Sequence, residues 1–262
     1  MNFPQSRMLE KIIEITQEAG DRILQVYKSG DLRTQTKADG SPVTRADFIS
    51  HEFISGELER EFGYPVLSEE GDLPPHSTRR DWTHFFLVDP LDGTKDFIAQ
   101  NDQFTINVAL IQNNKPVLGV VALPAMGELF FGQTGQGAWK RSGQQTDALP
   151  LSIAKGKVLA RSLLHDNSML ESFSRQNSID ECIKMSSAVR LPRLAQGQIN
   201  LCVISSRSQE WDIAAGHVLV AETGGQIFGM QSKVEPGYNK PNLGNEFSIA
   251  CSKEIQPDDL VF

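Results

Sequence analysis

The feature that most constrains this chain is an apolar run that leads directly into an acidic loop, residues 89–94, which reads Asp-Pro-Leu-Asp-Gly-Thr. The run predicts a buried strand over 84–88 that carries two carboxylates, Asp89 and Asp92, at its C-terminal end. The proline between them restricts the backbone, and the glycine permits a conformation that other residues avoid. We therefore expect a stiff bend, with a helix opening at Thr94.

A loop of this kind suits both a metal ion and a phosphate group. A helix N-terminus presents free N–H groups to an anion, and carboxylates beside it suit a hard divalent cation. The alternative is an ordinary strand-to-helix turn in which Asp89 and Asp92 only cap the helix. Two further acidic segments favour the first interpretation: a Glu pair at 69–70 follows another short apolar strand, and Asp212 begins a predicted helix. By itself, Asp212 would more often be an N-cap than a ligand.

The overall charge narrows the class of partner. The 262 residues carry a formal net charge of −8, whereas a protein that binds nucleic-acid polymers without sequence preference needs a basic face. A small anionic substrate is still compatible with this charge, because bound metal ions reverse the local field.

The three cysteines are widely spaced, and none forms a Cys-x-x-Cys pair. This spacing argues against a disulfide framework and against a zinc site, and it favours reduced thiols in the core. The chain has no apolar run of about 18 residues and no signal-peptide pattern at its start, so we expect a cytoplasmic enzyme without a transmembrane segment. Peripheral association with a membrane is left open.

The order of the expected elements divides the chain into two halves. Residues 1–147 read as an α+β half and residues 148–262 as an α/β half, with a polar turn over 141–147 at the boundary. The expected helices are 6–29, 45–61, 169–176, 187–196 and 212–223. The expected strands are 64–67, 84–88, 104–112, 116–123, 126–132, 137–140, 158–162, 199–204, 226–228 and 247–250.

The second expected helix has a distinct start. Thr44 suits the N-cap position, and Asp47 stands at the capping-box position in place of the usual Glu. The inward-facing apolar residues expected on this helix are Phe48, Phe53, Ile54 and Leu58.

Taken together, the acidic segments resemble the inositol monophosphatase superfamily, whose members are Mg²⁺-dependent, lithium-sensitive phosphatases. Its pattern is a Glu-Glu pair, then Asp-Pro-(Ile/Leu)-Asp-Gly-Thr, then Trp-Asp before Ala-Ala or Ala-Gly, and all three occur here in that order. The resemblance spans nearly the whole chain. It implies an α/β fold, namely a layered αβαβα sandwich with the active site between its two halves.

The resemblance also implies roles for individual residues. The implied ligands of two or three Mg²⁺ ions are Glu69, Asp89, the Leu91 carbonyl, Asp92 and Asp212. Asp89 would bridge two of the ions, Thr94 and Asp47 match the pair that activates the attacking water, and the N–H groups of Gly93 and Thr94 match the phosphate cradle. Because about four negative charges would share one pocket, we expect these carboxylates to raise one another's pKa values unless metal is bound.

Within the superfamily, the chain is similar to bacterial 3′(2′),5′-bisphosphate nucleotidases, which remove the 3′-phosphate of adenosine 3′,5′-bisphosphate. The segments that carry this similarity are 37–47, 67–70, 95–97, 211–216 and 238–241. The similarity implies a small phosphorylated substrate, and it leaves a homodimer open because family members are often dimers.

The residues expected to contact the substrate, besides the cradle of Gly93 and Thr94, are Lys37, Arg190 and Arg207. Both arginines should face the cleft, whereas Lys37 is equally consistent with a solvated charge in a polar loop. Residues 186–190 read Ser-Ser-Ala-Val-Arg where many nucleotidases have Gly-Ser-Ser-Leu-Lys, and Ser205 stands where inositol-specific members usually have Glu. We expect Trp211 and His217 to be core residues.

Two other functions stay open at this point. One is a sibling phosphatase that acts on inositol phosphate, histidinol phosphate or a sugar bisphosphate. The other is a non-catalytic regulator that binds metal or phosphate, although the presence of every implied ligand argues against it.

Overall fold

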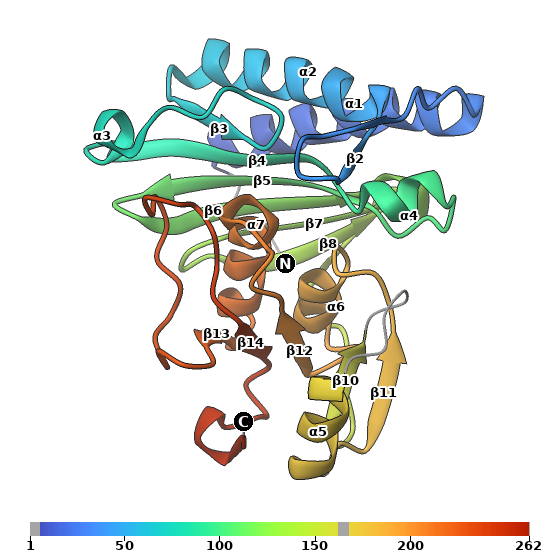
Figure 1. Cartoon of the computed structure of the whole chain (residues 1–262), viewed down its shortest axis with the longest axis vertical. Coiled ribbons are helices and arrows are strands. Elements are labelled where there is room, and N and C mark those ends of the chain that lie inside the picture. The colour runs from blue at the N-terminus through green and yellow to red at the C-terminus, as the bar shows by residue number, and fades with distance from the viewer. Residues whose placement is uncertain (1–5, 162–167, 262) are drawn as a thin grey trace.

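The chain folds into five layers, which confirms the expected αβαβα architecture (Figure 1). The computed structural model describes residues 6–161 and 168–261. The layers are, in order, a pair of long helices, a seven-stranded sheet, a central pair of helices, a five-stranded sheet and a last short helix. The helices of these layers are α1 (Arg7–Ser29) and α2 (Arg45–Phe62), then α6 (Arg190–Gln196) and α7 (Glu210–Glu222), then α5 (Ser168–Gln176).

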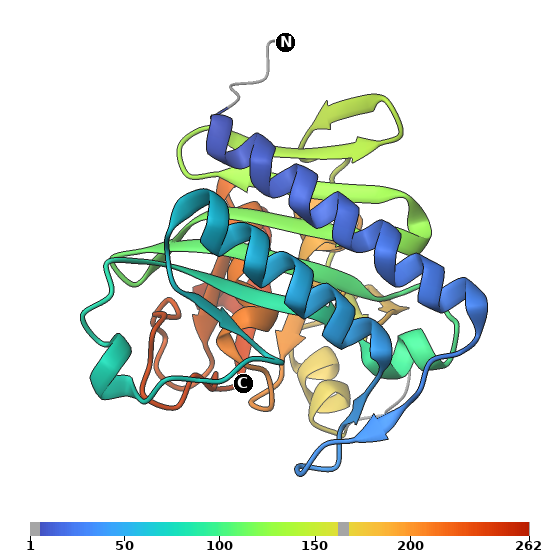
Figure 2. The same cartoon turned by 90° about the horizontal axis from the view of Figure 1, so that it is seen from above.

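The two outer helices lie side by side across the large sheet (Figure 2). The hydroxyl of Ser6 caps α1 by accepting from the Leu9 N–H, and Gly30 ends the helix in the left-handed conformation at φ 71°. The apolar stripe of α1 faces α2 and the sheet. The fully buried isoleucines of this stripe and of α2 are Ile12, Ile23 and Ile54.

The large sheet holds its strands in sequence order, and every neighbouring pair is antiparallel except β3 and β4. Its strands are β3 (Val66–Ser68), β4 (His84–Asp92), β5 (Thr105–Gln112), β6 (Lys115–Leu123), β7 (Glu128–Gln133), β8 (Gly137–Ser142) and β9 (Gln145–Ala148). The parallel pairing places the carboxyl ends of β3 and β4 at one edge of the sheet. The Glu pair and the acidic loop therefore meet there.

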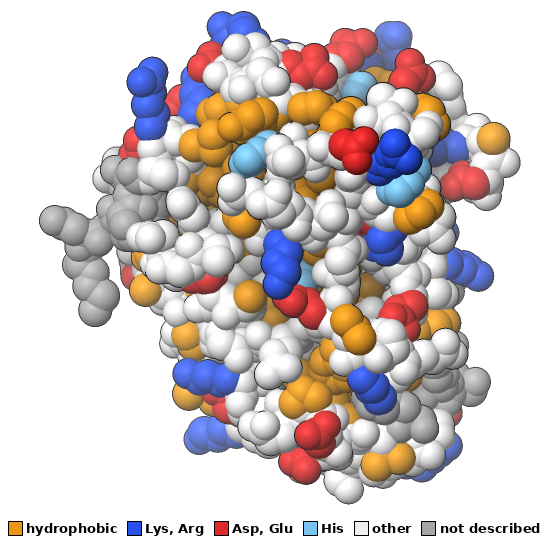
Figure 3. Space-filling view, turned by 90° about the vertical axis from the view of Figure 1, so that its left-hand side faces the viewer, with side chains coloured by type: hydrophobic (Ala, Val, Ile, Leu, Met, Phe, Trp, Pro, Cys, Tyr) orange, Lys and Arg blue, Asp and Glu red, His pale blue; other side chains and the backbone are white. Residues whose placement is uncertain are grey.

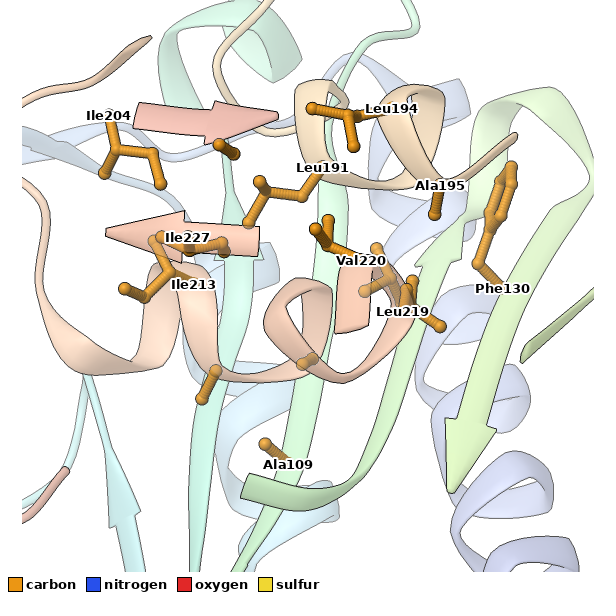
Figure 4. Close-up of a cluster of buried hydrophobic side chains, with 14 of the residues drawn as sticks. Ala109, Phe130, Leu191, Leu194, Ala195, Ile204, Ile213, Leu219, Val220 and Ile227 are labelled. Atoms are coloured by element: carbon orange, nitrogen blue, oxygen red, sulfur yellow. The ribbon is translucent and has the colours of Figure 1, made fainter. Parts of the chain in front are cut away.

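Helix α7 packs on the other face of this sheet, over a row of small residues. Figure 4 shows Ala109 and Phe130 of the sheet in one hydrophobic cluster with Leu219 and Val220 of α7. The strand register aligns Ala109, Gly119, Gly132 and Ala138 across β5 to β8. A Cβ atom added at Gly119 would stand 2.3 Å from the carbonyl oxygen of Ala215 on α7. The helix backbone thus rests directly on the sheet backbone, which sets the height of α7 above the sheet.

The smaller sheet has the strand order β11-β10-β12-β14-β13. Its strands are β10 (Val158–Arg161), β11 (Glu181–Lys184), β12 (Leu201–Ile204), β13 (Gln226–Gly229) and β14 (Ser248–Cys251). The first three strands in space are parallel and the last two pairings are antiparallel. One face packs on α6 and α7, and the other packs on α5 and the C-terminal segment.

The remaining elements are short. They are the ribbon of β1 (Gln35–Thr36) and β2 (Pro42–Val43), helices α3 (His76–Arg79) and α4 (Thr94–Ile98), and the 3₁₀ turns Pro124–Met126 and Pro257–Asp259. Within the described parts of the chain, no helix combines the length and the apolar character needed to cross a membrane. On the face drawn in Figure 3, the basic side chains of the described residues stand among acidic ones rather than in one continuous patch.

Several sequence expectations need correction. Phe48 is 41% exposed, because Asp47 and Ser50 take the inward face of α2. The expected helix over 187–196 begins only at Arg190, and strand β11 was not expected at all.

The polar stretch 141–147 forms the hairpin of β8 and β9 rather than a free turn, so the division of the chain at 147 stays a prediction. Cys202 and Cys251 are buried as expected, but Cys182 is exposed, and all three thiols are free. The last residue of the expected strand 158–162 lies outside the described residues.

Candidate active site

The acidic loop is built as the sequence predicts. Strand β4 continues through the loop to Asp92, with a bulge between Asp89 and Asp92 that breaks its register with β5. The Asp89 side chain is 1% exposed, and its Oδ1 accepts from the Leu91 N–H at 3.0 Å. Gly93 adopts φ 89° and α4 begins at the next residue, so the first N–H groups of this helix point away from it toward the loop.

Thr94 and Asp47 meet beside this loop. The Thr94 hydroxyl lies 3.3 Å from Asp47 Oδ1 and 3.4 Å from the Leu91 carbonyl, both as hydrogen-bond acceptors. The other oxygen of Asp47 accepts from the Thr44 N–H at 2.7 Å and from the Thr44 hydroxyl at 2.6 Å, which confirms the capping box. Burial raises the pKa of Asp47, against the lowering effect of the Thr44 hydrogen bonds. The Thr94 hydroxyl therefore lies beside the buried carboxylate of Asp47.

Three carboxylates lie close together, and of these Asp89 is buried while Asp92 and Asp212 are half-buried and line a cavity. Burial, followed by the charges of Glu69, Asp92 and Asp212, raises the pKa of Asp89 well above its usual value. Burial and the charges of Asp212 and Glu69 likewise raise the pKa of Asp92. The pKa of Asp212 rises to about 7, mainly through burial, although the Gln209 N–H that its Oδ2 accepts works in the opposite direction. The pKa values of the three aspartates are therefore raised, as expected from the sequence, with burial as the largest cause and neighbouring negative charge as the second.

Lys37 stands at the rim of this acidic group. Its ammonium donates to Glu69 Oε1 at 2.8 Å and also to Glu70. Burial disfavours the lysine charge, but the two carboxylates outweigh that effect and raise its pKa. The structure thus pairs Lys37 with an expected metal ligand, and the expectation that it contacts substrate stays a prediction.

The expected ligands are carboxylate oxygens, which suit a hard cation. In this structure several of these oxygens accept hydrogen bonds from the protein instead. Among residues 6–161 and 168–261, no three acidic, His or Cys side chains already converge as a metal-binding group. Each expected carboxylate ligand instead has a local partner or a close acidic neighbour, as with Glu69 on Lys37 and Asp89 on the Leu91 N–H. Buried carboxylates that raise one another's pKa values are stabilised when a cation replaces the protons. The residues therefore fit a divalent metal ion by their chemistry.

Strand β5 places two buried polar side chains without hydrogen-bond partners beside the acidic loop. Asn107 and Thr105 lie directly opposite Asp89 and Asp92, so their side chains stand on the same face of the sheet. Asn107 Nδ2 and Thr105 Oγ1 are buried without a hydrogen-bond partner among the described residues. The Asn107 amide is close enough to lower the pKa of Asp92 but does not reach hydrogen-bonding geometry. Unpaired buried polar atoms of this kind are typical of positions that bind water or ions.

A cavity of about 240 Å³ adjoins this acidic group. Its lining includes two acidic residues, Asp92 and Asp212, and two arginines, Arg190 and Arg207. The Arg190 guanidinium donates to the Val203 carbonyl at 3.2 Å, and its Nε is buried without a partner among the described residues. The rest of the wall is largely apolar, so the cavity combines two cationic groups with a hydrophobic surface.

Sequence reasoning missed the residues that seat the start of α7. Glu210 is fully buried and accepts from the N–H groups of Asn239 and Lys240 at 2.6 Å and 2.8 Å, and from the Lys240 ammonium at 2.9 Å. Arg79, 2% exposed, donates to Asn239 Oδ1 at 2.7 Å. The similarity at 238–241 was the available signal, since this segment anchors the helix that carries Asp212.

The two expected core residues of this region are confirmed. Trp211 is 6% exposed within the central hydrophobic cluster. His217 is 3% exposed, and its Nδ1 lies 2.8 Å from the Tyr238 hydroxyl.

Comparison with known proteins agrees with this geometry. A model of the inositol monophosphatase family matches residues 5–260. The 3′(2′),5′-bisphosphate nucleotidase CysQ of Escherichia coli K12 is 36% identical over 228 residues, which cover 86% of this chain and 92% of that protein, and the CysQ of Salmonella typhimurium is 35% identical with the same coverage. The crystal structure of CysQ from Bacteroides thetaiotaomicron, at 31% identity, covers 96% of this chain and 99% of its own with a TM-score of 0.85. The chain therefore belongs to the inositol monophosphatase family.

Proposed function

We propose that this protein is a Mg²⁺-dependent 3′(2′),5′-bisphosphate nucleotidase that removes the 3′-phosphate of adenosine 3′,5′-bisphosphate. The observation that carries the proposal is the cavity that joins the acidic group to Arg190 and Arg207. A substrate with two phosphates needs a reaction centre for one phosphate and cationic groups for the other. The acidic residues and the two arginines that line this cavity would supply both. The relatives in Escherichia coli and Salmonella typhimurium are named for this activity.

Enzymes of this family depend on metal ions, generally Mg²⁺. In this chain, the residues that would hold two or three ions are Glu69, Asp89, the Leu91 carbonyl, Asp92 and Asp212. The raised pKa values of the three aspartates support this set, because burial and neighbouring negative charge disfavour their charged forms, which a bound cation would stabilise. When bound, the ions supply a water of lowered pKa and stabilise negative charge on the phosphate and the leaving oxygen.

The residues of the chain itself position the reactants. Thr94 Oγ1 donates to Asp47, so its lone pairs are available to orient a water at the loop, and Asp47 can accept the proton that passes through the hydroxyl. The N–H groups at the start of α4 face the phosphate oxygens. The two arginines hold the second phosphate, and the apolar wall covers the base.

Initial rates of phosphate release, with and without Mg²⁺, test the proposal. The substrates are adenosine 3′,5′-bisphosphate, 5′-AMP, inositol 1-phosphate, histidinol phosphate and fructose 1,6-bisphosphate. We expect the highest kcat/KM on the first. A higher value on any other substrate would overturn the nucleotidase assignment.

Two variants separate metal use from substrate recognition. Asp89→Asn should abolish Mg²⁺-dependent turnover on every substrate and leave the fold intact. Arg207→Ala should raise KM for the bisphosphate and leave the weaker turnover of 5′-AMP nearly unchanged. Full activity of Asp89→Asn would disprove the metal assignment. A cytoplasmic location and a homodimer stay predictions from the sequence.

A further inference from the structure

Ser186 joins the two halves of the molecule through both of its donors. Its hydroxyl donates to Asp96 Oδ2 at 2.6 Å, and its N–H donates to Gln103 Oε1 at 2.9 Å. Ser186 is 3% exposed and Asp96 is 6% exposed, so the bond between them is shielded from water, and the bond to the half-buried Gln103 is partly shielded. Ser186 stands at the start of the segment that leads to Arg190, whereas Asp96 and Gln103 follow the acidic loop.

The two acceptors are themselves linked, which closes a ring. The Asn101 amide donates to the other oxygen of Asp96, and Asn101 Oδ1 accepts from the Gln103 N–H at 3.0 Å. The ring therefore consists of Ser186, Asp96, Asn101 and Gln103, and it is called the Ser186 ring below. A closed set of hydrogen bonds, of which the Ser186–Asp96 bond is buried and the other three are partly buried, leaves each member little freedom to move alone.

The Ser186 ring lies where the cavity wall meets the acidic loop. Ser187, Ala188 and Arg190 line the cavity immediately after Ser186. A Cβ atom added at Gly93 would stand 3.2 Å from the Gln103 carbonyl and 3.5 Å from Ala188 Cβ, so the wall rests against the loop with no spare room. Ser186 and Asp96 are not among the residues that line the cavity, and their effect on a substrate must pass through the wall.

We infer that the Ser186 ring sets the distance between the reaction centre and the wall that holds the non-hydrolysed part of the substrate, which makes Ser186 and Asp96 positioning residues for specificity. The inference rests on the proposed function, because it takes that part to be the nucleoside with its second phosphate. A substrate that occupies only the reaction centre does not touch the wall. The ring should therefore matter for the bisphosphate and not for a minimal phosphate ester.

The first test compares Ser186→Ala with the unchanged protein on adenosine 3′,5′-bisphosphate and on p-nitrophenyl phosphate. KM for the bisphosphate should rise about tenfold, the order expected when one hydrogen bond to a charged group is lost. The kcat on the bisphosphate and the kcat/KM on p-nitrophenyl phosphate should change by less than about twofold. Ser174→Ala is the matched control, since this hydroxyl donates only to the Leu170 carbonyl in its own helix or lies near a thiol at 4.0 Å.

The second test uses an exchange that conserves charge and volume. Asp96→Asn alone removes the charged acceptor of the ring: the new amide either faces the Asn101 amide or turns over and donates to the Ser186 hydroxyl, and with only neutral bonds left KM for the bisphosphate should again rise. Asp96→Asn combined with Asn101→Asp restores all four bonds, because the introduced amide donates to the introduced carboxylate, which still accepts from the Gln103 N–H. Recovery of KM in the pair, with unchanged unfolding midpoints, supports positioning by the ring itself.

Two outcomes would overturn the inference. One is an equal loss on both substrates, which would place the effect at the reaction centre; the other is an unchanged KM for the bisphosphate in a folded Ser186→Ala protein. Failure of the proposed function is seen separately, as a preference of the unchanged protein for another ester in the substrate panel. The same variants are then compared on that ester and on p-nitrophenyl phosphate, and either of the two outcomes above would again overturn the role of the Ser186 ring.

Discussion

Gly119→Ala tests whether the contact between α7 and the large sheet controls both stability and the site. The added methyl would lie 2.3 Å from the Ala215 carbonyl oxygen and 2.9 Å from Ala215 Cα. An ordinary carbon contact needs about 3.5 Å, so α7 must retreat by roughly 1 Å. Both neighbours are backbone atoms, and no side-chain rotation can relieve the overlap.

The cost of that retreat can be stated for stability and for activity. Overpacking a core typically lowers the free energy of unfolding by about 1–3 kcal/mol, and a backbone overlap belongs at the upper end, about 3 kcal/mol. Asp212 lies one turn before Ala215 on the same helix, so it moves with the helix. A displacement of about 1 Å at a reaction centre can lower turnover roughly 100-fold.

Urea unfolding and Mg²⁺-dependent phosphate release provide the two measurements. Gly56→Ala is the matched control, because a Cβ atom there meets no atom within 4 Å in the interior of α2. It should stabilise the protein by about 1 kcal/mol, as expected for replacing a helical glycine. If the free energy of unfolding of Gly119→Ala lies within about 0.5 kcal/mol of that of the unchanged protein, the row of small residues does not determine how closely α7 packs on the sheet.

Three further outcomes follow from the site. Asp47→Asn should fold normally, since one amide oxygen can still accept from Thr44, and should lower kcat by about 10²–10⁴-fold in a phosphate-release assay; near-normal kcat would remove Asp47 from the mechanism. Burial, with the charge of Glu69, raises the pKa of Asp212 to about 7, and an acid whose pKa rises on folding loses stabilisation as the pH rises from about 4 to about 7. Thermal unfolding should therefore show a larger Mg²⁺-induced rise in Tm at pH 8 than at pH 5, and equal rises would contradict the metal assignment. Glu210→Ala leaves Arg79 and the Lys240 ammonium without their buried acidic neighbour and should lower the free energy of unfolding by about 3–5 kcal/mol in urea; a loss below about 1 kcal/mol would show that α7 is seated by other contacts.

The features that sequence reasoning reached correctly depend on neighbours along the chain. The capping box of Thr44 and Asp47 spans three residues, and the left-handed Gly93 is adjacent to the helix that it starts. Apolar runs also predicted β4 and the hairpin of β5 and β6, because a buried strand needs continuous apolar residues. These interactions are local, so the amino-acid order carries them almost completely.

The exposed and polar elements were harder to predict. Strand β11 has an exposed burial pattern and takes its place only by pairing with β10 at the sheet edge. Phe48 has the apolar character of a core residue, yet the inward face of α2 is taken by Asp47, whose carboxylate accepts hydrogen bonds from Thr44 and Thr94. Hydrophobicity alone does not report which face a functional side chain occupies.

By itself, the sequence determined the acidic loop and the helix that follows it, because both depend on short-range geometry, whereas the layered fold was expected from the resemblance to a known family. Only the tertiary structure decided how far burial and neighbouring charges raise the pKa values of Asp89, Asp92 and Asp212, since both effects depend on how the layers pack. It also decided the pairing of Ser186 with Asp96, two residues 90 positions apart. Such contacts form when separate layers pack together, and no local pattern in the chain records which side chains will then meet.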